Sequence, residues 1–158
     1  MKVYLAGPDV FRLDAEDWAI EARALCVARG LIPLLPLDGT EITASGIYLA
    51  NRKLLTETDV VVANLNPFRG SEPESGTCVE IGMALALGKP VIGYLDDHSQ
   101  MIHRVAVRRH GEHYLCGDGL KVENFGMALN LMLGVPARII KGGLADALDA
   151  LVMAETSG

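Results

Sequence analysis

One stretch, Asp59-Val-Val-Val-Ala-Asn-Leu65, constrains the fold of this chain more than any other. It is nearly all apolar, which is typical of a central parallel strand that is covered on both faces. Shorter apolar runs predict three further strands, at residues 2–6, 31–35 and 90–94. The segments between strands carry apolar residues at helical spacing, at residues 15–29, 46–58 and 77–87. This alternation predicts an α/β fold in which one parallel sheet is flanked by helices.

Turn and capping residues set the expected ends of these elements. Asp14 precedes the first helix and is expected to cap it, and Gly88 follows the third helix as a C-cap. Pro33 removes a ladder donor, which favours an edge position for the second strand. Residues 96–118 are polar and are expected to form a loop or lid with a short strand at 112–115. Two more helices are expected, at 124–133 and 144–153.

Length and composition favour a single soluble domain spanning residues 1–158. A chain of 158 residues, half of them hydrophobic, can bury a sizeable core and is not expected to be disordered. Its longest apolar runs are too short to span a membrane, and its N-terminus lacks the pattern of a signal peptide. We therefore expect a cytoplasmic protein that does not bind membranes.

Charge and potential metal ligands narrow the function classes. The formal net charge of −6 argues against binding of a nucleic acid polymer, although single nucleic acid components need only one pocket. The three cysteines have no paired spacing, so neither a disulfide framework nor a zinc site is expected. The four histidines, all between 98 and 113, also lack a carboxylate or cysteine at ligand spacing.

The predicted sheet places the binding site before any motif is considered. In open parallel sheets, ligands bind outside the carboxyl ends of the strands. Loops 7–13, 66–75 and the segment from residue 95 onward all meet this condition. A pocket is therefore expected between these loops.

Glu80 is an ionisable residue inside an otherwise apolar helix, and it has two interpretations. In the first, Thr77-Cys-Val-Glu80 is a capping box, and Glu80 only bonds back to the cap residue. In the second, Glu80 is a functional carboxylate, because Ala84 and Leu87 on the same helix face are apolar. Glu74, six residues earlier, would then supply a second carboxylate of the kind that glycosidic chemistry uses.

Other side chains near the same strand ends are candidates for ligand contact. Phe11 and Phe68 are loop aromatics that could stack on a flat base, and Arg69 could reach a polar ligand. Ser75 and Gly76 open a helix whose free N–H groups favour an anion. The loop lacks the glycine pattern of dinucleotide sites and the lysine of triphosphate sites.

Several motifs, kept in order and spacing over roughly residues 1–133, resemble the nucleoside 2-deoxyribosyltransferase family. They are Tyr4-Leu-Ala-Gly-Pro8 with Val10-Phe11, Ala50-Asn51, Asp59-Val-Val-Val-Ala-Asn-Leu-Asn-Pro-Phe-Arg-Gly70, Ser75-Gly-Thr-Cys-Val-Glu-Ile-Gly-Met-Ala84, Gly88-Lys-Pro90, Glu123-Asn-Phe-Gly126 and Asn130-Leu-Met132. The Pro-Phe-Arg-Gly loop marks a subgroup of that family. The resemblance implies a flavodoxin-like, doubly wound sheet and transfer of 2-deoxyribose between nucleobases, with 2′-deoxynucleosides and free nucleobases as substrates and without a cofactor or metal.

The resemblance also implies roles for individual residues. Glu80 matches the nucleophile that holds the sugar as a covalent ester, and Tyr4 matches the residue that orients it. Glu74 matches the acid, usually Asp, that binds the base and assists its proton transfer. Asn51 is expected to contact substrate, and Asn130 to enter the site of a neighbouring subunit, which makes a homodimer or an assembly of dimers the expected state. The substrate-binding set is Gly7, Pro8, Phe11, Asn51, Phe68, Arg69, Ser75, Gly76 and Asn130.

Two alternatives stay open at this point. The first is a 2′-deoxynucleoside 5′-monophosphate N-glycosidase, which uses a similar glutamate and water as acceptor, and in which Ser75 and its helix N-terminus could receive the phosphate. The second is a non-catalytic module that senses nucleosides or nucleotides. The tail, residues 154–158, departs from the aromatic ending of family members that use a C-terminal carboxylate, so that role is not carried over.

Overall fold

The computed structural model describes residues 1–105 and 107–156 of the chain. Five parallel strands form the main sheet: β1 (Lys2–Ala6), β2 (Ile32–Leu34), β3 (Val60–Asn64), β4 (Val91–Leu95) and β8 (Arg138–Lys141). Their spatial order is β2-β1-β3-β4-β8, which is the flavodoxin-like order of doubly wound sheets. The predicted fold class is therefore confirmed, as is the edge position of the second strand.

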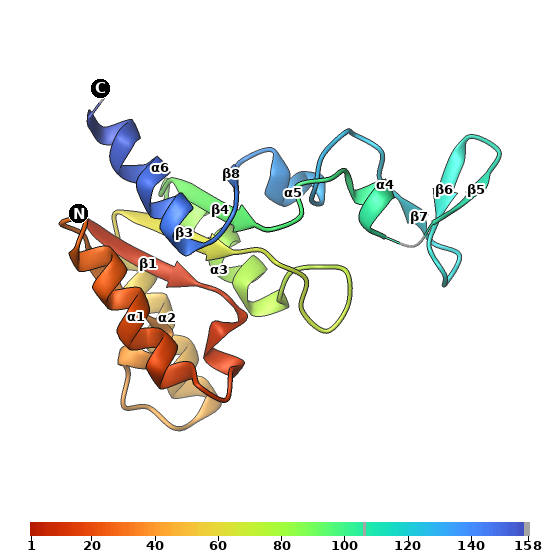
Figure 1. Cartoon of the computed structure of the whole chain (residues 1–158). Helices are drawn as coiled ribbons and strands as arrows, with labels where there is room; N and C mark the ends of the chain where they lie inside the picture. Colours follow the sequence, from red (N-terminus) through yellow and green to blue (C-terminus); the bar gives the residue numbers. More distant parts are fainter. Residues whose placement is uncertain (106, 157–158) are drawn as a thin grey trace.

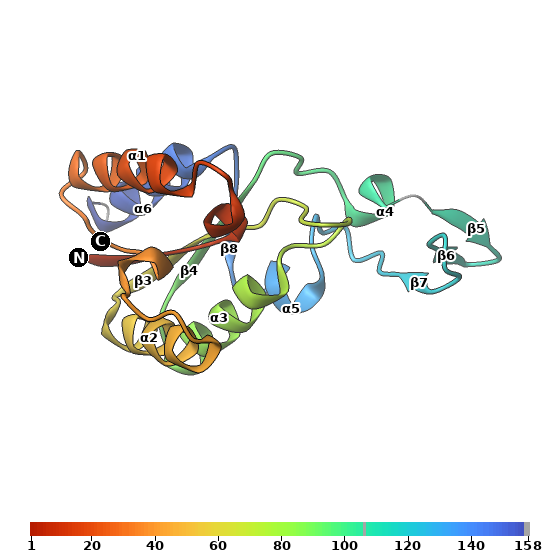
Figure 2. The ribbon, with the colours of Figure 1, turned by 90° about the horizontal axis from the view of Figure 1, so that it is seen from below.

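Helices cover both faces of this sheet, as Figures 1 and 2 show. On one face lie α1 (Ala15–Val27) and α6 (Leu144–Thr156), and on the other lie α2 (Ala44–Glu57) and α3 (Ser75–Ala86). Each face of the sheet has its own hydrophobic core, and alternate residues of the central strands pack into one or the other. Val3 faces α1 and α6, whereas the next residue, Tyr4, faces α2 and α3. Both faces of β3 are buried, which explains why its sequence is apolar throughout.

The first helix begins at Ala15 as predicted, but its predicted side-chain cap is wrong, and so is the predicted start of the third helix. The carboxylate of Asp14 accepts no bond from the first turn of α1 and instead receives Arg12 Nε and Nη2 at 2.9 and 2.8 Å. The helix predicted at 77–87 begins two residues earlier, at Ser75. Its end is close to the prediction, since Gly88 follows it with a left-handed φ of 71°.

The last third of the chain departs most from the sequence-based expectation. Residues 96–118 do not form only a loop with one strand: α4 (Met101–Arg104) is followed by β5 (Arg108–His110) and β6 (His113–Leu115), which pair with β7 (Lys121–Val122) in a small antiparallel sheet. This sheet extends away from the parallel one (Figure 1). Residue 106 lies outside the described part of this segment.

The helix predicted at 124–133 is also wrong. Only α5 (Leu131–Gly134) forms, because Gly126 adopts a left-handed φ of 75° and the Asn130 side chain caps the helix by accepting a bond from Met132 N at 2.9 Å. Strand β8 was not predicted. The final helix is confirmed and extends to Thr156, while Ser157 and Gly158 of the tail lie outside the described residues.

Within the described ranges, no helix has both the length and the apolar character needed to cross a bilayer.

Candidate active site

A cavity of about 400 Å³ opens beside the carboxyl ends of β1 and β2, at the predicted side of the sheet. We call it the Glu80 cavity. Its volume lies within the usual range for small-molecule sites. It is lined by residues from four segments of the chain: Gly7, Val10 and Phe11; Pro36, Leu37, Gly39 and Glu41; Ile47 and Asn51; and Gly76 and Glu80.

The carboxylate of Glu80 is held through one of its two oxygens. Tyr4 on β1 donates its hydroxyl to Oε1 at 2.7 Å, and Asn51 on α2 donates Nδ2 to the same oxygen at 3.4 Å. Oε2 accepts no hydrogen bond from the described residues. The arrangement fixes the carboxylate and leaves one oxygen for a ligand in the cavity.

Burial changes the acid strength of both partners. The pKa of Glu80 is raised above its usual range because burial disfavours the charged form, and the nearby charge of Glu74 adds to this, while the bonds from Tyr4 and Asn51 act in the opposite direction. The pKa of Tyr4, which is fully buried, is also raised, first by burial and then by the charge of Glu80. Tyr4 therefore keeps its proton and acts as a donor.

Glu74, and not Thr77, is the N-cap of α3. Its side chain accepts bonds from Gly76 N at 2.8 Å, from Thr77 N at 2.6 Å and from the Thr77 hydroxyl at 3.0 Å. The capping-box interpretation of Glu80 is therefore wrong, since Glu80 lies beyond the first turn and bonds to Tyr4 and Asn51. Burial raises the pKa of Glu74, but the bonds from Gly76 and Thr77 outweigh it, so that the pKa is lowered overall.

This cap also occupies the helix N-terminus that was considered as an anion site. The N–H groups of Gly76 and Thr77 are already paired with a carboxylate, and the hydroxyl of Ser75 lies 3.4 Å from Glu74 Oε1. Gly76 lines the Glu80 cavity, whereas Glu74 and Ser75 are not among its lining residues.

Three predicted contact residues form a stack at one side of the cavity. The rings of Phe11 and Phe68 lie 5.3 Å apart and are stacked, and the guanidinium of Arg69 lies over both of them, 4.6 Å from the Phe68 centroid and 5.5 Å from the Phe11 centroid. Arg69 adopts φ of 52°, which is uncommon for a residue other than glycine. Phe11 belongs to the single-turn helix Pro8–Phe11 that follows Gly7, so Pro8 starts the segment that carries the ring.

Gly7 has no room for a side chain because it packs against a hydrogen-bonded pair, Asp9 and Asn64, that sequence reasoning missed. A Cβ at Gly7 would lie 2.8 Å from Asn64 Cβ and 2.9 Å from Asp9 Oδ2. Asp9 is buried and accepts a bond from Asn64 Nδ2 at 2.9 Å. Only a residue without a side chain therefore fits at this edge of the cavity.

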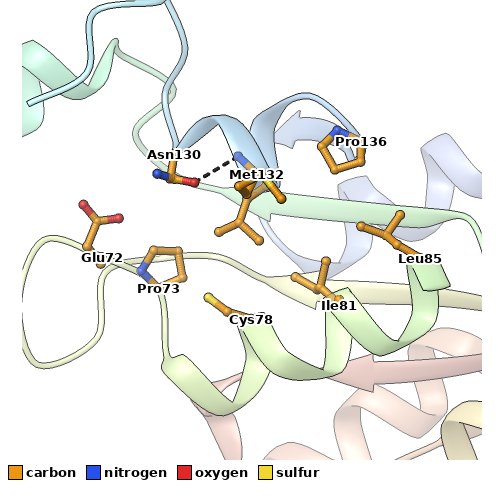
Figure 3. A pocket seen from close by; sticks show the side chains of 10 residues that line it. Glu72, Pro73, Cys78, Ile81, Leu85, Asn130, Met132 and Pro136 are labelled. Carbon is orange, nitrogen blue, oxygen red and sulfur yellow. Dashed lines mark hydrogen bonds between the residues drawn. The ribbon is translucent and has the colours of Figure 1, made fainter.

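Asn130 lies on the other side of α3. It lines a separate, mainly apolar cavity of about 710 Å³, together with Glu72, Cys78 and Ile81 (Figure 3). Its Nδ2 donates to Glu123 Oε1 at 2.7 Å. Asn130 does not line the Glu80 cavity of its own chain, so its contribution to a neighbouring site stays a prediction.

Two features of the cavity were not predicted. Glu41 lines it from the loop after β2, and Asn51 Oδ1 is buried without a hydrogen-bond partner among the described residues. The rule that ligands bind at the carboxyl ends of strands applies equally to the loop after the second strand, so it could have pointed to Glu41. Among all residues that the structure describes, no cluster of three or more potential metal ligands occurs.

Comparisons with known proteins agree on the type of fold. Residues 3–132 match a family model described as nucleoside 2-deoxyribosyltransferase. A structure described as a 2-desoxiribosyltransferase from Leishmania mexicana is similar with a TM-score of 0.84 at 34% identity, over 96% of this chain and 97% of that one. A CMP N-glycosidase from Clostridium botulinum has a TM-score of 0.54 at 14% identity, over 97% and 99% of the two chains, a likeness of fold alone.

One curated relative is similar in sequence. An uncharacterized protein of Schizosaccharomyces pombe is 33% identical over an alignment of 129 residues, which covers 75% of this chain. The matched region covers 60% of the length of that relative.

Proposed function

Because this chain belongs to the nucleoside 2-deoxyribosyltransferase family, we propose that it transfers 2-deoxyribose between nucleobases through a covalent ester on Glu80. The family model and the Leishmania mexicana structure support an enzyme that acts on the N-glycosidic bond of nucleosides. The observation that carries the proposal is the state of Glu80, which lines the cavity: its Oε1 accepts bonds from Tyr4 and Asn51, and its Oε2 accepts none from the described residues.

The proposed reaction has two displacements at C1′. Oε2 of Glu80 attacks C1′ while the bond to the base breaks, and the electron pair of that bond leaves with the base, which takes up a proton from the solvent. The oxocarbenium-like charge that develops on the sugar is stabilised by the adjacent carboxylate. A nitrogen of the second base then attacks C1′, loses its proton and releases Glu80 as a carboxylate.

Asn51 and Glu74 have supporting roles in this proposal. The buried Oδ1 of Asn51 needs a donor, and a sugar hydroxyl supplies one. Glu74 is kept ionised by the bonds from Gly76 and Thr77 and, as the cap of α3, holds the start of the helix that carries Glu80; its direct contact with the base, which the resemblance implies, stays a prediction.

The cap at α3 supports nucleosides over 5′-monophosphates as substrates. A phosphate at this helix N-terminus would meet the charge of Glu74 and would find the N–H groups of Gly76 and Thr77 already paired. The related 5′-monophosphate N-glycosidase reaction is therefore the less favoured alternative. We also propose a homodimer in which Asn130 enters the partner's site, because it lies outside the Glu80 cavity of its own chain.

The test is incubation with deoxyinosine and adenine. Formation of deoxyadenosine supports transfer, whereas free deoxyribose that appears at the same rate with or without adenine would show a hydrolase. A requirement for a 5′-phosphate on the donor would point to the nucleotide enzyme.

A slow 2′-fluoro nucleoside should label Glu80 with one sugar unit, detectable by mass spectrometry of the peptide. Glu80→Ala should abolish transfer and labelling while the fold is retained. Base exchange that survives in this variant would disprove the role of Glu80.

A further inference from the structure

Glu41 is a carboxylate of the Glu80 cavity to which neither the sequence motifs nor the family resemblance gives a role. It lies in the loop between the short helix Pro36–Asp38 and α2, and its side chain lines the cavity together with Leu37, Ile47 and Glu80. Among the described residues, it has no hydrogen-bond or ion-pair partner. The charge of Glu41 is therefore free to meet a ligand.

This carboxylate lies beside Gly46, in the first turn of α2. A Cβ at Gly46 would clash with Glu41 Oε2, so the carboxylate lies directly beside the first turn of the helix. Asn51, which bonds to Glu80, is five residues further along, or about 7.5 Å at 1.5 Å per residue. Glu41 and Glu80 thus line the same cavity from two different segments of the chain, the loop before α2 and helix α3.

The wall of this cavity suits a flat ring. Phe11 contributes an aromatic face that is backed by Phe68 and Arg69, and Leu37 and Ile47 contribute apolar surface. When a base stacks against this wall with its sugar at Glu80, the edge of the base away from the sugar is left for another residue of the same cavity, and Glu41 is the other carboxylate that lines it.

We propose that Glu41 recognises the base and makes the site selective for bases with an exocyclic amino group at that edge, adenine and cytosine, over their oxo counterparts, hypoxanthine and uracil. The proposal rests on the proposed function. An ionised carboxylate only accepts hydrogen bonds. Adenine N6 and cytosine N4 present N–H donors, whereas the carbonyl oxygens of oxo bases are acceptors and would face a negative charge.

Glu74 cannot take this role in the same way, because its oxygens are already bonded to Gly76 and Thr77 and it does not line the cavity. In this proposal Glu41 also stabilises an amino base as it leaves the sugar. When a ring nitrogen next to the amino group takes up its proton, the resulting pair of N–H donors matches the two carboxylate oxygens.

The test compares Glu41→Gln with wild type on matched donors, deoxyadenosine against deoxyinosine and deoxycytidine against deoxyuridine. The ratio of kcat/KM within each pair should fall roughly 5- to 150-fold in Glu41→Gln, the range for loss of a good paired contact to a base. Glu112→Gln, at the exposed turn between β5 and β6, is the control and should leave both ratios unchanged. Ratios that stay unchanged in Glu41→Gln would overturn the inference while base exchange itself stands.

Calorimetry with free adenine and free hypoxanthine decides the inference without turnover. Wild type should bind adenine more tightly than hypoxanthine, and Glu41→Gln should lose that difference. If no donor is turned over by wild type, the proposed function fails but this measurement still applies. Equal binding of adenine by wild type and Glu41→Gln would then reject the role of Glu41.

Discussion

Replacing Glu80 by Gln should inactivate the enzyme and at the same time stabilise its fold at neutral pH. The raised pKa of Glu80 means that burial, the largest contribution, outweighs the bonds that favour its charged form. A group whose pKa is higher in the folded than in the unfolded chain makes the folded state less stable as the pH rises through these two values. At neutral pH the ionised Glu80 is therefore a net cost to stability, which Gln removes.

The size of the gain follows from two opposing changes. In Glu80→Gln the amide oxygen still accepts from Tyr4 and Asn51, but these bonds lose their charge-assisted part, about 1 kcal/mol. The free-energy cost of burying the charge is larger than this loss, and Gln removes that cost completely. We expect a net gain of about 0.5–2 kcal/mol, as found when functional sites are relaxed, or about 1–8 °C in Tm for a chain of this size.

Thermal unfolding of both proteins between pH 4.5 and pH 8 measures this effect. The difference in Tm should be largest at neutral pH and should shrink as the pH falls toward about 4.3, the ordinary pKa of glutamate, because wild type then carries a proton on Glu80. Glu112→Gln, which removes an exposed charge, serves as the control. A Glu80→Gln variant that melts below wild type at pH 7, or a difference independent of pH, would refute the reasoning.

Three further variants test other parts of the site. Tyr4→Phe removes the 2.7 Å bond that lowers the pKa of Glu80, so the acid limb of kcat/KM should move to higher pH; an unmoved limb would contradict this role. Gly7→Ala should lower Tm by about 2–12 °C through its clash with Asn64 and Asp9, whereas Gly82→Ala, whose Cβ meets nothing within 4 Å, should not. Glu74→Ala should cost about 0.5–2 kcal/mol in urea unfolding at pH 7, and this difference should shrink as the pH falls through the lowered pKa of Glu74; a difference that persists in acid would argue against an ionised cap.

Elements with strong local patterns could be predicted from the sequence, and elements set by their surroundings could not. Strand β3 is apolar because both of its faces are buried, and that signal is present in its own residues. Strand β8, Arg138–Lys141, has charged residues at both ends and only two partly buried residues between them, so it is defined by pairing with β4 and not by its own pattern.

The helix starts show the same limit on a smaller scale. Thr77 and Glu80 have the spacing of a capping box, but Glu74 accepts the bond from Thr77 N that Glu80 would accept in such a box, and a choice between two acceptors depends on geometry. Asp14 likewise precedes a helix, yet its carboxylate accepts hydrogen bonds from the guanidinium of Arg12 and not from the helix N-terminus.

Within the site, the family resemblance pointed to Tyr4, Asn51 and Glu80, which the structure brings together. It could not point to the buried Asp9 and Asn64 pair or to Glu41. Those residues become neighbours of the cavity only through the packing of loops that follow β1, β2 and β3.

The bond between Tyr4 and Glu80 joins residues that are 76 positions apart, and this separation sets the order of events during folding. Contacts between distant residues close large loops and form slowly. The bond can form only when β1 lies beside β3 and α3 packs on the same face of the sheet. In a refolding experiment, recovery of activity should therefore lag behind the recovery of helical signal and mark the completion of the sheet.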